Sequence, residues 1–230
     1  MERSLSQVLF QFLPGNTFDY SDGRGSWKVN RLETSDVSGK IDTKYVADRV
    51  AARTNNWDGG SEGYPPYEDQ GAFHFGKPEA VHAEPFPTVY ECDECGHVEW
   101  YWDAEDLLSD NAQQTCPRSC SGDLNHMQVV SVHSCGNIEG LTQWSCSQHG
   151  SSYIKLNRRG SQKVSNFKWE CGLCSASTGV SYRESCDCDY QPPSATPEDE
   201  DSMYTTVHRA GSVYYPHYFN KINLVDSNMG

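Results

Sequence analysis

The spacing of the cysteines is the feature that most constrains how this chain can fold. Cys92 and Cys95 form a CxxC pair, and Cys116 and Cys120 form a CxxxC pair after twenty intervening residues. A tight turn aims two thiolates at one point, and two such turns brought together by a hairpin complete the tetrahedron of sulfur atoms that zinc prefers. Gly96 permits the tight backbone that lets amides donate to sulfur. These four cysteines therefore predict a zinc ribbon.

Disulfides, a redox-active CxxC and free buried thiols are the alternatives for these cysteines. The N-terminal MERSLSQVLFQFLPG has charges and glutamines that make it a poor signal peptide, so we expect a cytoplasmic chain. Reducing conditions disfavour structural disulfides, and a thioredoxin-like motif needs a βαβ context that the pattern lacks. No stretch approaches the roughly 20 apolar residues of a membrane span, so we expect no membrane partner.

A second set of cysteines predicts a second zinc site. Cys171 and Cys174 form another CxxC, in the turn CGLC, and a hairpin that begins at Cys146 would bring that residue beside Cys171. Cys186 then closes a four-sulfur site after a short loop. Our preferred ligands are therefore Cys146, Cys171, Cys174 and Cys186.

The spacing leaves other ligand sets open for this second site. Cys135 is the main rival to Cys146 or Cys186, and Cys188 is an alternative to Cys186. His133 and His149 lie nearby in the sequence. An iron–sulfur cluster could also use these thiolates.

Both predicted sites have four protein ligands, which is the arrangement of structural rather than catalytic zinc. We therefore expect two structural zinc ions. Binding of such an ion contributes roughly 10–16 kcal/mol in apparent terms, whereas the net stability of a domain is about 5–15 kcal/mol. Only 36% of the residues are hydrophobic, so the metals would compensate for a thin core.

The pattern of elements predicts an α+β, mostly β fold: irregular zinc-ribbon-like domains with short strands, long loops and few helices. We expect a helix or strand over residues 5–12, strands at 17–20, 26–30 and 128–133, a helix at 43–52, a loop at 54–79, and a hairpin with arms 153–156 and 164–169. The expected domains are an α/β segment with a long loop at 1–84, a double zinc-ribbon-like domain at 85–190, an acidic disordered linker at 191–203 and an aromatic strand segment at 204–230.

The chain is acidic, with a formal net charge of −14 from 32 Asp and Glu against 18 Lys and Arg. Such a surface argues against broad, non-specific binding to nucleic acid. We interpret it as adaptation to high salt, where dense carboxylates keep a protein soluble. An ordinary acidic cytosolic protein is the alternative interpretation.

One stretch departs from this acidic background, because no carboxylate lies between Glu139 and Glu170. Basic and aromatic side chains interleave there, and together they can contact phosphates and stack on bases. In the competing interpretation the aromatic residues are core and the basic residues form a solvated hairpin tip. The candidate residues for binding nucleic acid or a partner are Lys155, Arg158, Arg159, Lys163 and Lys168.

Local catalytic motifs do not appear in the sequence. It has no GxxxxGK[ST], HExxH or GxSxG motif, and it lacks the PCxxC that a deaminase would require, since the stretch after Thr115 runs CPRSC. We therefore expect a binding or structural protein rather than an enzyme, with no small-molecule substrate. A metal-dependent hydrolase remains an alternative, and an open metal position beside a carboxylate would favour it.

Several segments together resemble the DrmB family, the zinc-bearing accessory protein of the DISARM anti-phage system. RSLSQVLFQFLPGNTFDYSDG looks like that family's opening segment, and FPTVYECDECG looks like its first zinc knuckle. SCGNIEG followed by Trp144 looks like its next block, although Asn137 stands where the family usually has histidine. LNRRGSQKVSNFKWECGLC looks like its hairpin into the second CxxC, and HRAGSVYYP like a later strand motif.

The resemblance implies a non-catalytic partner of a helicase that acts on DNA in antiviral defence. It covers only the N-terminal part of that longer family, so we expect the chain to represent that part. A free-standing zinc-ribbon protein that binds nucleic acid without a partner is the alternative.

Overall fold

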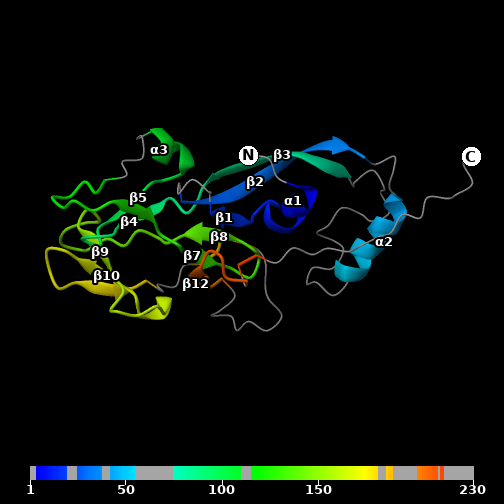
Figure 1. The fold of residues 1–230 in the computed structure, drawn as a ribbon. Coiled ribbons are helices and arrows are strands. Elements are labelled where there is room, and N and C mark those ends of the chain that lie inside the picture. The colour runs from blue at the N-terminus through cyan, green and yellow to red at the C-terminus, as the bar shows by residue number, and fades with distance from the viewer. Residues whose placement is uncertain are drawn as a thin grey trace, which may run out of the picture.

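The computed structural model describes residues 4–19, 25–37, 42–54, 75–109, 115–180, 185–188, 201–211 and 213–214. Within these residues the protein is mostly β, with short antiparallel strands, few helices and many loops, which confirms the predicted fold class. The strands of the described residues form four sheets of three strands each (Figure 1). No helix in the described part is both long and apolar enough to cross a membrane.

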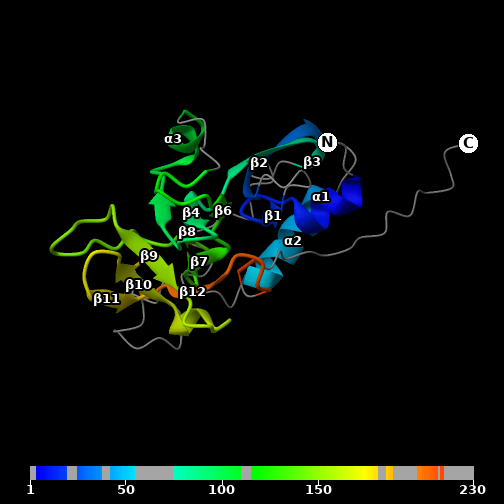
Figure 2. The same cartoon turned by 60° about the vertical axis from the view of Figure 1, so that its left-hand side comes forward.

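The N-terminal sheet has the order β1-β2-β3 and carries helix α1. Ser4 and Gln7 form a capping box that starts α1, which lies beside the sheet (Figure 2). Val8 and Phe12 of this helix segment pack with Val29 of the sheet. The elements of this part are α1 (Leu5–Gln11), β1 (Thr17–Asp19), β2 (Ser26–Asp36), α2 (Thr43–Thr54) and β3 (Gly76–Pro85).

The predicted loop over residues 54–79 needs a correction at its end. Residues 76–79 belong to β3, because β2 runs on to Asp36 and offers these residues a pairing partner, with Asp36 opposite Gly76. Most of that predicted loop, residues 55–74, lies outside the described residues.

Two further sheets are built around the paired cysteines. The order β5-β4-β6 combines β4 (Val89–Cys92), β5 (Val98–Trp100) and β6 (Leu124–His126), and helix α3 (Ala104–Ser109) follows β5. The order β11-β10-β9 combines β9 (Ile154–Asn157), β10 (Lys168–Cys171) and β11 (Ser177–Gly179). The predicted hairpin is present as β9 and β10, although its second arm begins with a 3-10 turn, Val164–Asn166.

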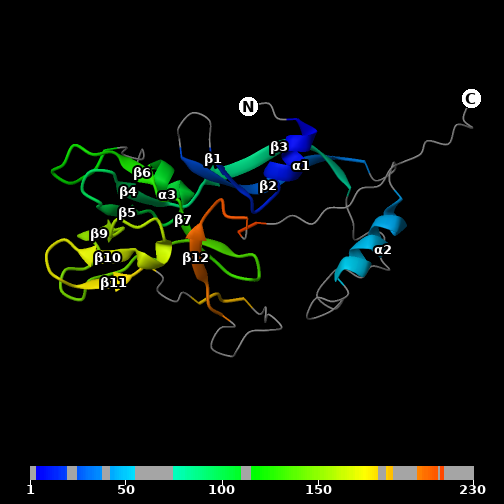
Figure 3. The ribbon, with the colours of Figure 1, turned by 60° about the horizontal axis from the view of Figure 1, so that its bottom comes forward.

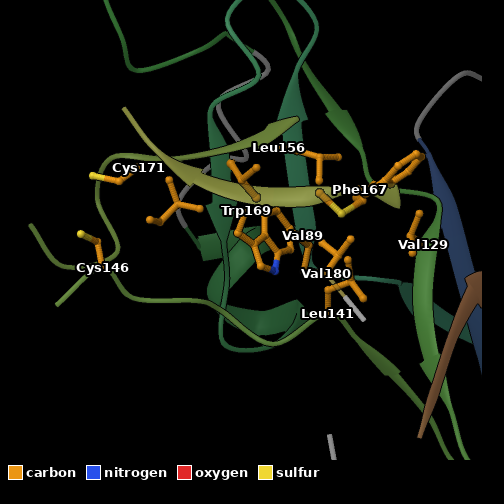
Figure 4. Packing of buried hydrophobic residues seen from close by; sticks show 12 residues of the cluster. Val89, Val129, Leu141, Cys146, Leu156, Phe167, Trp169, Cys171 and Val180 are labelled. Atoms are coloured by element: carbon orange, nitrogen blue, oxygen red, sulfur yellow. The ribbon is translucent and has the colours of Figure 1, made fainter. Parts of the chain in front are cut away.

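These two sheets meet at an edge that we call the seam. His97 and Lys155 form an isolated antiparallel bridge, and the backbone N–H of Leu156 donates to the carbonyl of Gly96 at 2.8 Å. The main hydrophobic cluster fills the space behind the seam, with Trp169 at its centre and only 2% exposed (Figure 4). Trp100 packs on Trp169 with ring centroids 5.3 Å apart. One shared core therefore holds the two cysteine-bearing sheets together.

The fourth sheet brings the C-terminal part of the chain back to the centre. It has the order β12-β7-β8, from β7 (Val129–Val132), β8 (Ile138–Gly140) and β12 (Tyr204–Val207), and β12 lies beside β7 (Figures 1 and 3). Within the described residues, the aromatic strand segment expected at 204–230 is a strand only from Tyr204 to Val207, because the chain turns after pairing with β7. Residues 191–200 of the predicted linker and everything after 214 lie outside the described residues.

Candidate metal centres

Ten free cysteines and two histidines gather into groups of four, each with its ligand atoms within 4.8 Å of one another. There are three such groups among the described residues, one more than the two sites that the spacing predicted. Site 1 is Cys92, Cys95, Cys116 and Cys120; site 2 is Cys146, His149, Cys171 and Cys174; site 3 is His133, Cys135, Cys186 and Cys188.

Site 1 brings together the four cysteines of the predicted zinc ribbon. Cys92 ends β4 and Cys95 follows in a turn that closes at Gly96, whose φ of 68° is a left-handed conformation. The other two ligands arrive from the loop before β6, which pairs with β4 and so places the second turn opposite the first.

Site 2 contains three of its four predicted ligands. Cys171 ends β10 and Cys174 lies in the turn after it. Cys146 and Cys171 lie together at one edge of the core (Figure 4). The fourth donor is His149, because the chain folds back between Cys146 and Gly150, with reciprocal backbone hydrogen bonds of 3.0 and 2.8 Å.

Cys186, the fourth ligand predicted for site 2, instead belongs to site 3. The backbone N–H of Cys186 donates to the carbonyl of Asp201 at 2.8 Å, and Ser185 pairs with Ser202. These contacts tie Cys186 to the segment that leads into β12, which lies on β7 rather than on β10. Cys135, from the β7–β8 turn, is therefore its neighbour, with the two sulfur atoms 3.7 Å apart.

The distances within the groups fit a single tetrahedral ion. Four sulfur ligands about 2.3 Å from zinc stand about 3.8 Å from one another, and a sulfur and an imidazole nitrogen about 3.6 Å. The sulfur–sulfur distances are 3.6 and 3.8 Å in site 1 and 3.7 Å in each of sites 2 and 3. His149 Nδ1 lies 3.8 Å from Cys146 Sγ and 3.4 Å from Cys171 Sγ, and His133 Nδ1 lies 3.2 Å from Cys188 Sγ.

These separations are too long for disulfides, whose sulfur atoms are bonded at about 2.05 Å. A tetrahedron of four cysteines, or of three cysteines and one histidine, is a ligand set that zinc prefers in structural sites. The residues present therefore fit zinc at all three sites.

Backbone amides donate to the sulfur atoms at every site. The N–H of Cys95 lies 3.5 Å from Cys92 Sγ, and the N–H of Asn137 lies 3.4 Å from Cys135 Sγ. At site 2 the N–H of Gln148 donates to Cys146, which lowers the pKa of that thiol to about 6. Such donors around the ligands stabilise thiolates and fix their direction toward an ion.

Other thiols in the same groups resist ionisation. Burial, together with the nearby sulfur atoms of Cys188 and Cys186, raises the pKa of Cys135 to about 11. Burial likewise raises the pKa of Cys116, with further increases from its three neighbouring cysteines. Several thiolates so close together need a cation, and a bound divalent ion would make the thiolate the stable form of each.

The predicted basic residues do not form one free surface. Arg158 pairs with Glu91 of β4 and lies over the Phe167 ring, 5.1 Å from its centroid. Lys155, Arg159 and Lys163 are exposed, and Lys168 is half-buried. The aromatic residues divide as well: Phe167 and Trp169 belong to the core, as the competing interpretation expected, while Tyr153 is 40% exposed.

The ligands that the preferred sets left out carry a local signal. CSQH, from Cys146 to His149, has the same two-residue gap as CxxC, and the pairs HSC and CDC both place two donors one residue apart. The sequence therefore contains a signal for histidine as a fourth ligand and for ligand pairs with a one-residue gap. Which two pairs combine into one site depends on tertiary packing.

Comparison with known proteins places the chain in a family. No curated protein matches it. The family described as a domain of unknown function (DUF8724) matches residues 4–215, a span that contains all three metal centres. The chain is thus a member of the DUF8724 family, and its cysteine and histidine ligands lie inside the family's domain.

Proposed function

We propose that this chain is a non-catalytic module, built on three zinc ions, of a nucleic-acid-processing antiviral defence complex, in which it docks on a helicase and contacts single-stranded DNA. The observation that carries the proposal is the donor set: each described site has four protein ligands. A tetrahedral ion with four protein ligands has no position left for water or substrate, whereas catalytic zinc keeps one open.

The zinc ions support this role by fixing the surfaces between them. Sites 1 and 2 lie in the two sheets joined at the seam, and site 3 joins the β7–β8 turn to the segment before β12. A chain with a thin core can thereby hold exposed loops in one arrangement, which reduces the entropy lost when a partner binds.

The contact surface in this proposal is the exposed part of the β9–β10 hairpin. Arg159 and Lys163 are exposed in the connection between the two strands, where the sequence carries no carboxylate. Arg158 is not part of the proposed surface, because its charge is matched by Glu91. The resemblance of this hairpin to the DrmB family supports the helicase and the defence role.

The test is the double variant Arg159→Glu with Lys163→Glu. We expect the zinc-loaded chain to bind a fluorescent single-stranded oligonucleotide, measured by anisotropy, and to retain a helicase in an affinity purification whose eluate is identified by mass spectrometry. Reversing two charges at a phosphate contact should weaken DNA binding by at least about tenfold and reduce its salt dependence.

The matched control is Lys44→Glu with Lys77→Glu, which makes the same charge change on α2 and β3. It should bind like the unaltered chain. Binding of DNA without any helicase would favour the free-standing nucleic-acid-binding protein. Absence of both DNA and helicase, with full zinc content, would contradict the proposal.

A further inference from the structure

A cleft of about 320 Å³ lies at the seam between the two cysteine-bearing sheets. Its volume is at the lower end of the range for small-molecule sites, roughly 300–1,000 Å³. Most of its lining is polar and comes from both halves of the seam: His97, Glu99, Arg118, Gln143, Ser151 and Ser152, with Val98 and Pro117.

Site 1 holds Arg118 at one side of this cleft. The residue lies inside the CxxxC turn, and its backbone N–H donates to Cys116. Its guanidinium lies over the ring of Tyr153, 4.7 Å from the centroid, on the side of the seam from which β9 begins. Among the described residues it has no carboxylate partner.

Glu99 contributes the opposite charge to the same cleft. Its Oε1 lies 2.5 Å from Nε2 of His97, whose side chain is only 2% exposed, so the buried imidazole orients the carboxylate. The side chain of Glu99 itself is 34% exposed. Within the described part of the chain Oε2 has no hydrogen-bond partner, and Glu99 forms no ion pair with Arg118.

Arg118 and Glu99 carry opposite charges and line one cleft without pairing, so a ligand that fits between them must interact favourably with both. A phosphate alone would meet Arg118 but would be repelled by Glu99. A planar group with acceptors and donors on its edge satisfies both, and a guanidinium plane is a stacking surface for a base. Guanine has N–H donors at N1 and N2 for a carboxylate and an acceptor at O6 for an amide or hydroxyl donor.

We propose that the seam cleft binds an unpaired guanine base, stacked on Arg118 and held at its Watson–Crick edge by Glu99. Gln143 and the hydroxyls of Ser151 and Ser152 line the same space and supply donors for O6. This assignment rests on the proposed contact with single-stranded nucleic acid and adds base selectivity to it.

The test compares oligonucleotides that differ by one base. Anisotropy should show that an oligothymidylate with a single central guanine binds about tenfold more tightly than oligothymidylate itself, because one well-formed base contact gives roughly that discrimination. Substituting hypoxanthine, which lacks the N2 amine, or adenine should remove the gain. A ribonucleotide series of the same sequences shows whether DNA or RNA is preferred.

Two variants locate the effect. Glu99→Gln should abolish the preference for guanine while binding to oligothymidylate stays unchanged. Arg118→Lys keeps the charge but removes the flat guanidinium, and should have the same effect. The matched control is Arg49→Lys. Arg49 lies on α2 with its guanidinium 5.4 Å from the centroid of the Tyr45 ring, and α2 does not line the cleft. Zinc content should be equal in all variants.

Guanosine, which has no phosphate, separates this inference from the proposed function. Nuclear magnetic resonance shifts around the seam with guanosine but not adenosine support the cleft even if no oligonucleotide binds. Equal affinity for guanine-containing and guanine-free oligonucleotides, together with no shifts from guanosine, would overturn the inference and leave the zinc module standing.

Discussion

At the scale of single residues, His149 decides whether site 2 is complete. His149 Nδ1 stands 3.4 Å from Cys171 Sγ, at the distance of two ligands on one ion. His149→Ala should lower the zinc content by about one equivalent and lower the melting temperature, since binding of a structural ion contributes to folding. His149→Cys should restore both, because a thiolate is an equally good zinc ligand.

Elemental analysis and thermal unfolding measure these two quantities. The matched control is His82→Ala, which removes a histidine of β3 that lies outside the three groups. Unchanged zinc content in His149→Ala would show that His149 is not a ligand.

His126 should make the folded protein sensitive to acid. Its Nδ1 accepts the N–H of Ser26 at 2.8 Å, and burial, with a smaller effect of His208, lowers its pKa to about 4. The unfolded chain takes up this proton near the ordinary pKa of about 6.5, whereas the folded protein does not until about pH 4. The contribution of His126 to the free energy of unfolding is therefore fully present above about pH 6.5 and is lost as the pH falls toward 4.

The size of this effect is about 2 kcal/mol of unfolding free energy between pH 7.5 and 5.0. His126→Asn keeps an acceptor for Ser26 but does not titrate, so its loss of stability over that range should be smaller by about this amount. Denaturant unfolding of both proteins at both pH values is the measurement. Because zinc loss in acid affects both proteins alike, parallel pH dependences would refute the role of His126.

At the scale of elements, site 3 should hold β12 on the core of the protein. The described segment 185–188 reaches the core through Cys186 and Cys188 at site 3 and through backbone contacts with residues 201 and 202. Cys188→Ser should therefore remove about one zinc equivalent and accelerate hydrogen exchange in β12, while β9 and β10 exchange as before. Cys174→Ser should give the reverse pattern.

Hydrogen exchange with mass spectrometry resolves the two sheets. If β12 and β10 respond equally to Cys188→Ser, site 3 does not have this separate role.

The elements also show what the sequence could predict. The four ligands of site 1 are recognisable because each pair lies within one turn, and both turns flank strands that pair directly. The β9–β10 hairpin is local in the same sense. Sequence order places Cys186 after Cys174 and so predicts it as a ligand of site 2, but the pairing of β12 with β7 brings it to Cys135 instead.

The pairing of β2 with residues 76–79 was missed for a similar reason. Its partner strands are separated by more than thirty residues, and only the assembled sheet shows that Gly76 lies opposite Asp36. Arg158 likewise reads as a free surface charge in the sequence, since its partner Glu91 comes from another sheet. Interactions between distant segments are fixed by packing rather than by local pattern.

At the scale of the whole molecule, the number of bound metal ions decides how this fold is stabilised. A chain with net charge −14 and 36% hydrophobic residues gathers ten cysteines and two histidines into three groups that could each hold a metal ion. Site 1 lies in the β5-β4-β6 sheet and site 2 beside β10, on the two sides of the seam, and site 3 lies between the β7–β8 turn and the segment that leads into β12.

The most direct test is the zinc stoichiometry of the intact chain, purified under reducing conditions without chelator. Native mass spectrometry should show three zinc ions per chain as the main species, and titration with a thiol-reactive mercurial should release three equivalents. Two ions per chain would contradict the third site. Fewer than one ion, with the chain still folded, would contradict the central claim that metal holds this fold together.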